Sequence, residues 1–85
     1  MEYFFKESAV RSLKKLPKPV QKRIFDKLNF YIIKNNLLQF ASPLKDKMLG
    51  DFRFRVGDYR IIFDLDLKHN KIIVLAVGHR KDIYK

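Results

Sequence analysis

Between residues 52 and 66 the apolar side chains recur at every second position, and this alternation constrains the fold more than any other feature of the chain. In an extended segment, Phe52, Phe54 and Val56 fall on one side. Arg53 and Arg55 fall on the other side. The pattern predicts a β-strand with one packed face and one cationic face.

A tight turn follows this strand. Gly57-Asp58 is typical of two-residue β-turns, and the alternation then resumes from Tyr59 to Asp66. The two segments therefore predict an antiparallel hairpin. One face of the second strand carries Tyr59, Ile61, Phe63 and Leu65, and the other carries Arg60, Ile62 and Asp64. Whether Arg60 shares the face of Arg53 and Arg55 is left open, because the register through the turn decides it.

The remaining segments predict one more hairpin strand, an N-terminal strand and two helices. Lys68-His69-Asn70 supplies a turn, and residues 71–77 are apolar on both faces, which favours an interior strand. Tyr3 to Phe5 has strand preference, a helical spacing of apolar residues begins near Glu7, and Pro19 suits the first turn of a second helix. The stripe of the first helix is Ala9, Val10, Leu13 and Leu16, and that of the second is Val20, Ile24, Leu28 and Ile32, widened by Phe25 and Tyr31. The opposite, solvated face of the second helix carries Lys22, Arg23, Asp26, Lys27 and Lys34.

These elements give the order β-α-α-β-β-β. We expect an α+β fold in which a helical hairpin packs on a small, mostly antiparallel four-stranded sheet, with an irregular connection over residues 37–43. No linker, repeat or low-complexity segment interrupts the chain, so residues 1–85 are expected to form a single domain.

The chain is strongly basic. It has 19 Lys plus Arg against 9 Asp plus Glu, a formal net charge of +10, and no cysteine. The charge favours an anionic partner, and composition alone does not choose between nucleic acid, an anionic membrane surface and an acidic protein. The absence of cysteine favours a reducing compartment, the cytoplasm, and no signal peptide or membrane span fits the sequence.

Arginines are concentrated in the strand-rich half. They are Arg53, Arg55, Arg60 and Arg80. Because clustered guanidinium groups repel one another unless an anion lies between them, their gathering on one face would indicate phosphate recognition. The alternative is that they cover an exposed sheet face and pair with the aspartates of the same half, Asp51, Asp58 and Asp64.

Other kinds of site find little support. His69 and His79 lie ten residues apart without a cysteine, so a structural zinc site is not expected. Asp64 and Asp66 share a strand face, and we expect their carboxylates to be solvated rather than to bind Mg²⁺. The glycines are isolated and form no phosphate-binding loop. We therefore expect no metal and no cofactor.

Several segments together carry a family resemblance. They are Leu44-Lys45, the run Phe-Arg-Phe-Arg-Val-Gly-Asp-Tyr-Arg-Ile-Ile-Phe over residues 52–63, Val-Gly-His-Arg over residues 77–80, and Ile83-Tyr84. The combination resembles the RelE/ParE superfamily of toxin–antitoxin toxins over nearly the whole chain, and members of that superfamily share the β-α-α-β-β-β order.

The resemblance implies a function by analogy. RelE-type members are ribosome-dependent endoribonucleases that cut messenger RNA in the decoding site and are held inactive by a cognate antitoxin. The implied partners are therefore an acidic, RelB-like antitoxin, forming a heteromer, together with the ribosome and mRNA. Two alternatives remain: a ParE-like inhibitor of DNA gyrase, and a nucleic-acid-binding module without catalysis.

The resemblance also implies site residues. The family's basic and aromatic working positions correspond to Arg53, Arg55, Arg60, Arg80 and Tyr84. The best-known RelE pattern has lysines at the first two of these positions, and arginine keeps the charge but is a very poor general base. Another subgroup pairs a glutamate with a histidine and a terminal tyrosine, and His79 resembles that histidine, although the glutamate has no clear counterpart. The flanking lysines are assigned to RNA binding: Lys45, Lys47, Lys81 and Lys85.

Two of these roles stay open. His79 is a candidate acid or base because its ordinary pKa of about 6.5 suits proton transfer at neutral pH, and a structural histidine at a strand end is the alternative. Tyr84 is a candidate to stack on a base or to orient the attacking hydroxyl, and closing the edge of the core is its alternative.

Overall fold

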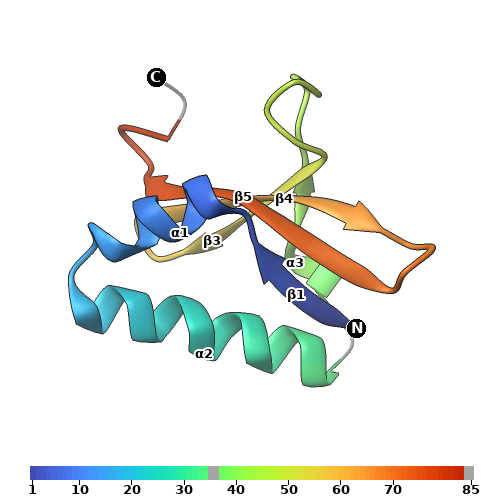
Figure 1. Cartoon of the computed structure of the whole chain (residues 1–85), viewed down its shortest axis with the longest axis horizontal. Coiled ribbons are helices and arrows are strands. Elements are labelled where there is room, and N and C mark those ends of the chain that lie inside the picture. Colours follow the sequence, from blue (N-terminus) through green and yellow to red (C-terminus); the bar gives the residue numbers. More distant parts are fainter. Residues whose placement is uncertain (35–36, 84–85) are drawn as a thin grey trace.

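The computed structural model describes residues 1–34 and 37–83 of the chain. Two helices pack against one face of a twisted sheet (Figure 1). In chain order the elements are β1 (Glu2–Phe5), α1 (Glu7–Lys14), α2 (Lys18–Lys34), α3 (Leu37–Phe40), β2 (Ser42–Pro43), β3 (Phe52–Val56), β4 (Tyr59–Asp66) and β5 (Lys71–His79).

The sheet has five strands in the order β1-β5-β4-β3-β2. β1 runs parallel to β5, and the other neighbouring pairs are antiparallel. β5 therefore lies inside the sheet, which confirms the position predicted from its two apolar faces. Its strand continues two residues beyond the predicted end at Val77 and finishes at His79.

The sequence prediction was wrong about the connection after α2. Residues 37–43 are not irregular: they form the short helix α3 and the edge strand β2, which makes the sheet five-stranded rather than four-stranded. Leu37 is buried, and the ring of Phe40 stacks on Tyr31 of α2 at 4.8 Å. These apolar contacts hold a helical turn too short to show a periodicity in the sequence.

The core lies between the sheet and the helices. α2 runs beneath the sheet, and α1 packs on β5 (Figure 1). The predicted stripe of α2 is confirmed at Ile24 and Leu28, which are fully buried, while Val20 and Ile32 are partly buried. Aromatic rings from β3 and β4 fill the centre of this layer, where Phe54 and Phe63 make an edge contact at 5.9 Å.

The loop between β2 and β3 covers part of the other face of the sheet. Gly50, in this loop, has a φ of 152°, and a Cβ atom there would lie 2.6 Å from Cγ2 of Ile62. The Asp51 N–H donates to Asp64 Oδ1 at 2.9 Å, and Asp51 Oδ2 accepts the Leu65 N–H at 3.4 Å. A residue without a side chain therefore lets the loop lie directly on the sheet.

The turn between β4 and β5 contains a pH-sensitive contact. His69 Nδ1 lies 2.8 Å from Asp66 Oδ2, and the His69 N–H donates to Asp66 Oδ1 at 3.1 Å. The hydrogen bonds from His69 lower the pKa of the Asp66 carboxyl. A carboxyl with a lowered pKa stabilises the folded state above its ordinary pKa, and this contribution is lost as the pH falls through the folded-state value.

We therefore expect Asp66→Asn to flatten the acid limb of the stability curve. Below the folded-state pKa of Asp66 the variant and the parent protein should have equal stability, and above its ordinary pKa the parent should be slightly more stable. Urea unfolding across the acid range measures the difference. Parallel curves for the two proteins would show that this contact adds no pH dependence.

Candidate active site

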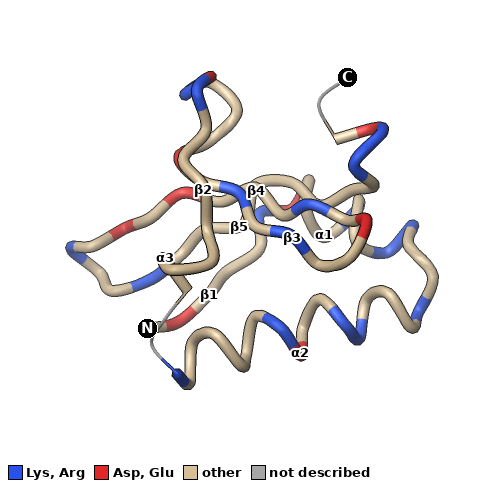
Figure 2. The backbone as a smooth tube through the Cα atoms, turned by 180° about the vertical axis from the view of Figure 1, so that it is seen from behind, with Lys and Arg blue, Asp and Glu red and all other residues tan. Residues whose placement is uncertain are grey.

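Three arginines share the sheet face that points away from the helices, and we call Arg53, Arg55 and Arg60 the arginine face. Arg55 pairs directly with Arg60 across the hairpin, and Arg53 pairs with Ile62. Paired residues in an antiparallel ladder point to the same side, so this register resolves the question that the sequence left open. Figure 2 shows the basic positions of β3 and β4 close together in the sheet.

Arg60 is held at the turn of the hairpin. Its Nη1 donates to the carbonyl oxygens of Gly57 and Tyr59, both at 3.0 Å. Gly57 has a φ of 60°, the left-handed conformation that a two-residue turn of this kind requires at its first position. Since Arg55 and Arg60 are cross-strand neighbours with like charges, the arrangement is unfavourable without a bound anion.

Arg80 reaches the same end of the sheet from β5. Its backbone N–H donates to the Asp58 carbonyl at 2.8 Å, and its Nε lies 3.7 Å from Asp58 Oδ1. Arg55 on β3, Arg60 on β4 and Arg80 directly after β5 therefore lie at one end of the sheet. Asp58 anchors Arg80 through both its backbone and its side chain. The ion pair with Asp58 is exposed to solvent, and the Arg80 side chain is 56% exposed.

The chain after β5 turns back onto the end of that strand, next to the arginine face. The Asp82 and Ile83 N–H groups both donate to the His79 carbonyl, at 2.8 and 3.0 Å. Gly78 pairs with Arg60, and a Cβ atom at Gly78 would lie 3.2 Å from Cδ1 of Ile83. The absence of a side chain at Gly78 therefore makes room for Ile83 beside Arg60. Tyr84 and Lys85, which follow, lie outside the described residues.

His79 does not join the arginine face. It pairs with Tyr59, on the side of the sheet that faces the helices, and the two rings meet edge to face at 5.5 Å. Its Nδ1 accepts the Lys81 N–H at 3.1 Å, which assigns the proton of the neutral ring to Nε2. Strand alternation explains this placement, because His79 is two residues from the buried Val77.

Three of the predicted RNA-binding lysines lie in the two segments that border the arginine face, and the fourth, Lys85, lies outside the described residues. Lys45 and Lys47 are exposed in the β2–β3 loop, and Lys81 is exposed after β5. Both segments rise on the same side of the sheet in Figure 2, with the strand arginines between them. The carboxylates of Asp51 and Asp64 accept backbone N–H groups in this region, so their hydrogen bonds secure the loop.

Sequence reasoning missed a further cation at the hairpin. The sequence placed Arg23 on the solvated face of α2, and it is indeed exposed. Its guanidinium nevertheless lies against Gly57, because a Cβ atom built at Gly57 would be only 2.7 Å from Arg23 Nη2. α2 passes beneath the end of the hairpin, which brings Arg23 against the turn. No local signal in the sequence could have found this contact, because it joins positions that are far apart along the chain.

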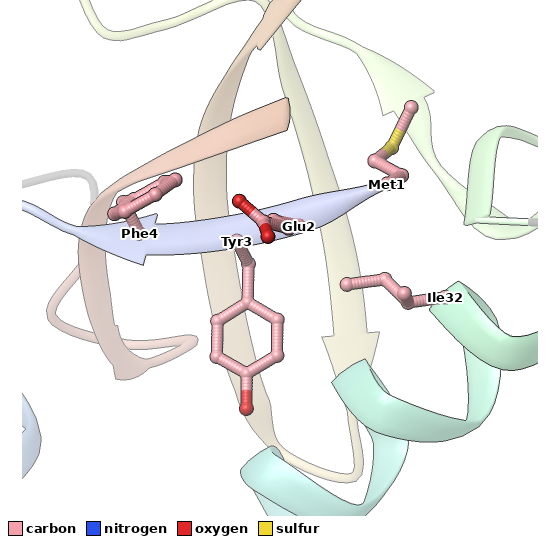
Figure 3. Close-up of a pocket in the computed structure, with 5 residues that line it drawn as sticks. All are labelled: Met1, Glu2, Tyr3, Phe4 and Ile32. Carbon is pink, nitrogen blue, oxygen red and sulfur yellow. The ribbon is translucent and has the colours of Figure 1, made fainter. Parts of the chain in front are cut away.

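A separate pocket lies between β1 and α2 (Figure 3). It has a volume of about 430 Å³ and is lined by Met1, Glu2, Tyr3, Phe4 and Ile32. Tyr3 points towards α2, where its hydroxyl donates to Asn29 Oδ1 at 3.0 Å. This lining contains a carboxylate and no basic side chain, so the pocket does not extend the arginine face.

Two further properties concern metals and membranes. Within residues 1–34 and 37–83, no three His, Asp or Glu side chains gather closely enough to hold a metal ion. None of the helices in that part of the chain has the length and hydropathy needed to cross a bilayer.

The comparisons with known proteins agree on a family. Residues 3–84 match the family described as ParE toxin of type II toxin–antitoxin system, parDE. The chain belongs to the RelE/ParE superfamily of toxin–antitoxin toxins. This confirms the resemblance that the sequence motifs carried. The chain is 32% identical to Toxin RelG of Mycobacterium tuberculosis over 81 residues, which cover 95% of this chain and 92% of that protein.

Solved structures of the superfamily share the fold. A toxin–antitoxin complex, RelBE2 of M. tuberculosis, contains a chain that matches with a TM-score of 0.78 at 29% identity, covering 93% of this chain and 96% of that one. A RelB–RelE antitoxin–toxin complex of Methanococcus jannaschii matches with a TM-score of 0.72 at 30% identity, covering 95% and 94%. The predicted α+β class is confirmed, with the additional edge strand described above.

Proposed function

We propose that the protein is an endoribonuclease of the RelE type that cuts messenger RNA on the ribosome. The observation that carries the proposal is the placement of Arg55 on β3, Arg60 on β4 and Arg80 directly after β5 at one end of the sheet, with Arg53 beside them on β3. Guanidinium groups match the geometry and charge of phosphate oxygens, and a folded protein gains no stability from placing them together.

The chemistry that such a cluster supports is transfer of a phosphoryl group within the RNA. The 2′-oxygen of one ribose attacks the neighbouring phosphorus, the bond to the 5′-oxygen breaks, and the products are a 2′,3′-cyclic phosphate and a 5′-hydroxyl. Negative charge grows on the non-bridging oxygens as the attack proceeds. Arginine donors aimed at those oxygens stabilise the transition state, and each is worth on the order of 10²-fold or more in rate.

Proton transfer is the weaker part of this site. The 2′-hydroxyl must lose a proton and the 5′-oxygen must gain one, and the arginines are poor bases at neutral pH. His79 is the proposed acid–base candidate, and Tyr84 is proposed to stack on a base or to orient the attacking hydroxyl. His79 carries its ring on the helix side of the sheet, so a role in proton transfer requires the RNA to reach the end of β5. Tyr84 lies outside the described residues.

A site with strong phosphate binding and weak acid–base groups depends on a partner that aligns the substrate. We infer that the ribosome holds the 2′-hydroxyl in line with the scissile bond, since positioning alone can supply several kcal/mol of a reaction barrier. The cognate partner in the resting cell is inferred to be an acidic, RelB-like antitoxin in a heteromeric cytoplasmic complex. The RelBE complexes among the structural relatives support this inference.

Purified protein is expected to cleave mRNA at least about a thousandfold faster on translating ribosomes than in free solution. The measurement compares one mRNA, with and without ribosomes stalled at a defined codon, and locates the cuts by primer extension. The predicted cuts lie inside the decoding-site codon. Equally fast cleavage of the free RNA would contradict ribosome dependence.

A second candidate function is inhibition of DNA gyrase. The matching family description names ParE, and ParE-type members share this fold. The arginine cluster favours the nuclease, because a gyrase inhibitor has no need of several phosphate-binding groups around one position.

A further inference from the structure

A small pocket adjoins the arginine face at the opposite end from Arg80. It has a volume of about 310 Å³ and is lined by Pro43, Leu44, Lys45, Asp46, Leu49 and Arg53. Arg53 thus belongs both to the arginine face and to the wall of the pocket. The volume is at the lower end of the range that holds small ligands, roughly 300–1,000 Å³, and suits one planar heterocycle.

The pocket is built by a loop with internal hydrogen bonds. The Leu44 N–H donates to the Asp51 carbonyl at 3.0 Å, which closes the base of the loop. At its tip, Asp46 Oδ1 accepts the Met48 N–H at 3.0 Å, and the Leu49 N–H donates to the Asp46 carbonyl at 3.1 Å. These bonds fix the Asp46 carboxylate and the backbone of Leu49, two of the residues that line the wall.

The lining combines two chemical characters. Pro43, Leu44 and Leu49 supply apolar walls, and Leu44 is buried beneath the loop. Lys45 and Arg53 bring positive charge, and Asp46 brings one hydrogen-bond acceptor. Apolar walls with a few polar groups and a cationic rim suit an unstacked base whose phosphate is held outside the pocket.

The spacing along β3 relates the pocket to the arginine cluster. Arg53 and Arg55 are two residues apart on one strand face, a separation of about 6.8 Å, which is comparable with the distance between successive phosphates of an extended RNA strand. An RNA strand with its scissile phosphate between Arg55, Arg60 and Arg80 therefore brings the neighbouring phosphate to Arg53. The base attached to that nucleotide then reaches the pocket.

Resting on the proposed function, we propose that this pocket binds the base next to the scissile phosphate and that Asp46 discriminates against uracil there. A carboxylate accepts hydrogen bonds and donates none. Adenine, cytosine and guanine each present an amino group on the pairing edge. Uracil presents one N–H there between two carbonyl oxygens, and the carboxylate repels these oxygens. The occupant could be an RNA base or an apolar side chain of an acidic protein. The cationic rim favours the RNA base, because the rim binds the phosphate of the same nucleotide whose base fills the pocket.

The test uses short RNAs that cannot be cleaved because the ribose of the attacking hydroxyl is 2′-deoxy. One series varies the base on the 5′ side of the scissile phosphate through all four identities, and a second series varies the base on the 3′ side. Fluorescence anisotropy measures the affinity of the protein for each RNA. In one series the uracil member is expected to bind about fivefold more weakly than the other three. Asp46→Asn, which keeps an acceptor for the Met48 N–H, should abolish that difference.

Two further variants complete the design. Asp26→Asn, on α2, removes a carboxylate far from the pocket and should keep the base preference. Leu49→Ala removes part of the apolar wall and should weaken binding of all members about threefold to fivefold. Equal affinities throughout both series would overturn the proposal, as would a preference that survives in Asp46→Asn. So would a Leu49→Ala protein that binds RNA normally but has lost affinity for its antitoxin, because the pocket would then serve a protein partner.

These readouts are independent of cleavage. A protein that discriminates among the bases but never cuts RNA on ribosomes contradicts the proposed nuclease function and leaves the base pocket standing. A protein that cuts mRNA with no base preference at either position contradicts the pocket and leaves the nuclease standing.

Discussion

Arg80→Ala is expected to lower ribosome-dependent mRNA cleavage by at least about a hundredfold while the fold is retained. Arg80 is exposed, and its side chain makes one ion pair, with Asp58 at 3.7 Å. Its anchoring hydrogen bond to the Asp58 carbonyl comes from the backbone and survives the substitution. Loss of an exposed ion pair has little effect on stability, whereas loss of one donor to the developing phosphoryl charge costs two orders of magnitude or more.

The chain offers a matched control for this substitution. Arg11 on α1 is also exposed and also makes a 3.7 Å ion pair, with Glu7. Arg11→Ala removes the same charge at a place remote from the arginine face, so cleavage should stay within about threefold of the parent. Circular dichroism spectra and thermal midpoints check that both variants fold. A folded Arg80→Ala protein with full cleavage activity would contradict the assignment of Arg80.

Phe54→Ala is expected to produce the largest loss of stability among single substitutions near the site, about 3–5 kcal/mol in the free energy of unfolding. The Phe54 side chain is 1% exposed and makes edge contacts with the rings of Tyr31 and Phe63, at 5.8 and 5.9 Å. Truncation leaves a cavity between the sheet and α2. Since domains of this size are stabilised by only about 5–15 kcal/mol, this loss is a large share of the total stability.

Urea unfolding followed by circular dichroism measures this loss. Phe54→Leu fills most of the same volume and should be clearly more stable than Phe54→Ala. Phe54 lies between Arg53 and Arg55 on β3 but on the opposite face. Activity of the leucine variant should therefore follow its folded fraction. A loss below about 1 kcal/mol for Phe54→Ala would show that this ring does not pack as described.

The sequence predicted the strands and helices well wherever the hydrophobic pattern was long enough. The alternation through Phe52–Val56 and Tyr59–Asp66 gave the hairpin, and the doubly apolar segment gave the interior strand. It did not predict α3 or β2. α3 spans four residues and depends on Phe40 stacking on Tyr31, and β2 spans two residues and depends on pairing with β3. Such elements are defined by tertiary contacts rather than by local periodicity.

The candidate site could be predicted only in part for a related reason. Residue types and spacing marked the arginines, but the register of the hairpin decides that Arg55 faces Arg60. The same alternation directs His79 to the helix side of the sheet, where it meets Tyr59. The contribution of Gly78, which gives Ile83 space beside Arg60, depends on how the chain after β5 folds back. None of these relations is local in sequence.

One preparation of the protein, assayed in parallel on mRNA and on DNA gyrase, tests the central claim most directly. The first assay supplies translating ribosomes and maps new RNA ends, and the second follows supercoiling of relaxed plasmid by gyrase. We expect cuts within decoding-site codons, with 5′-hydroxyl and 2′,3′-cyclic phosphate ends, and normal supercoiling. Intact mRNA together with inhibited gyrase would contradict the claim.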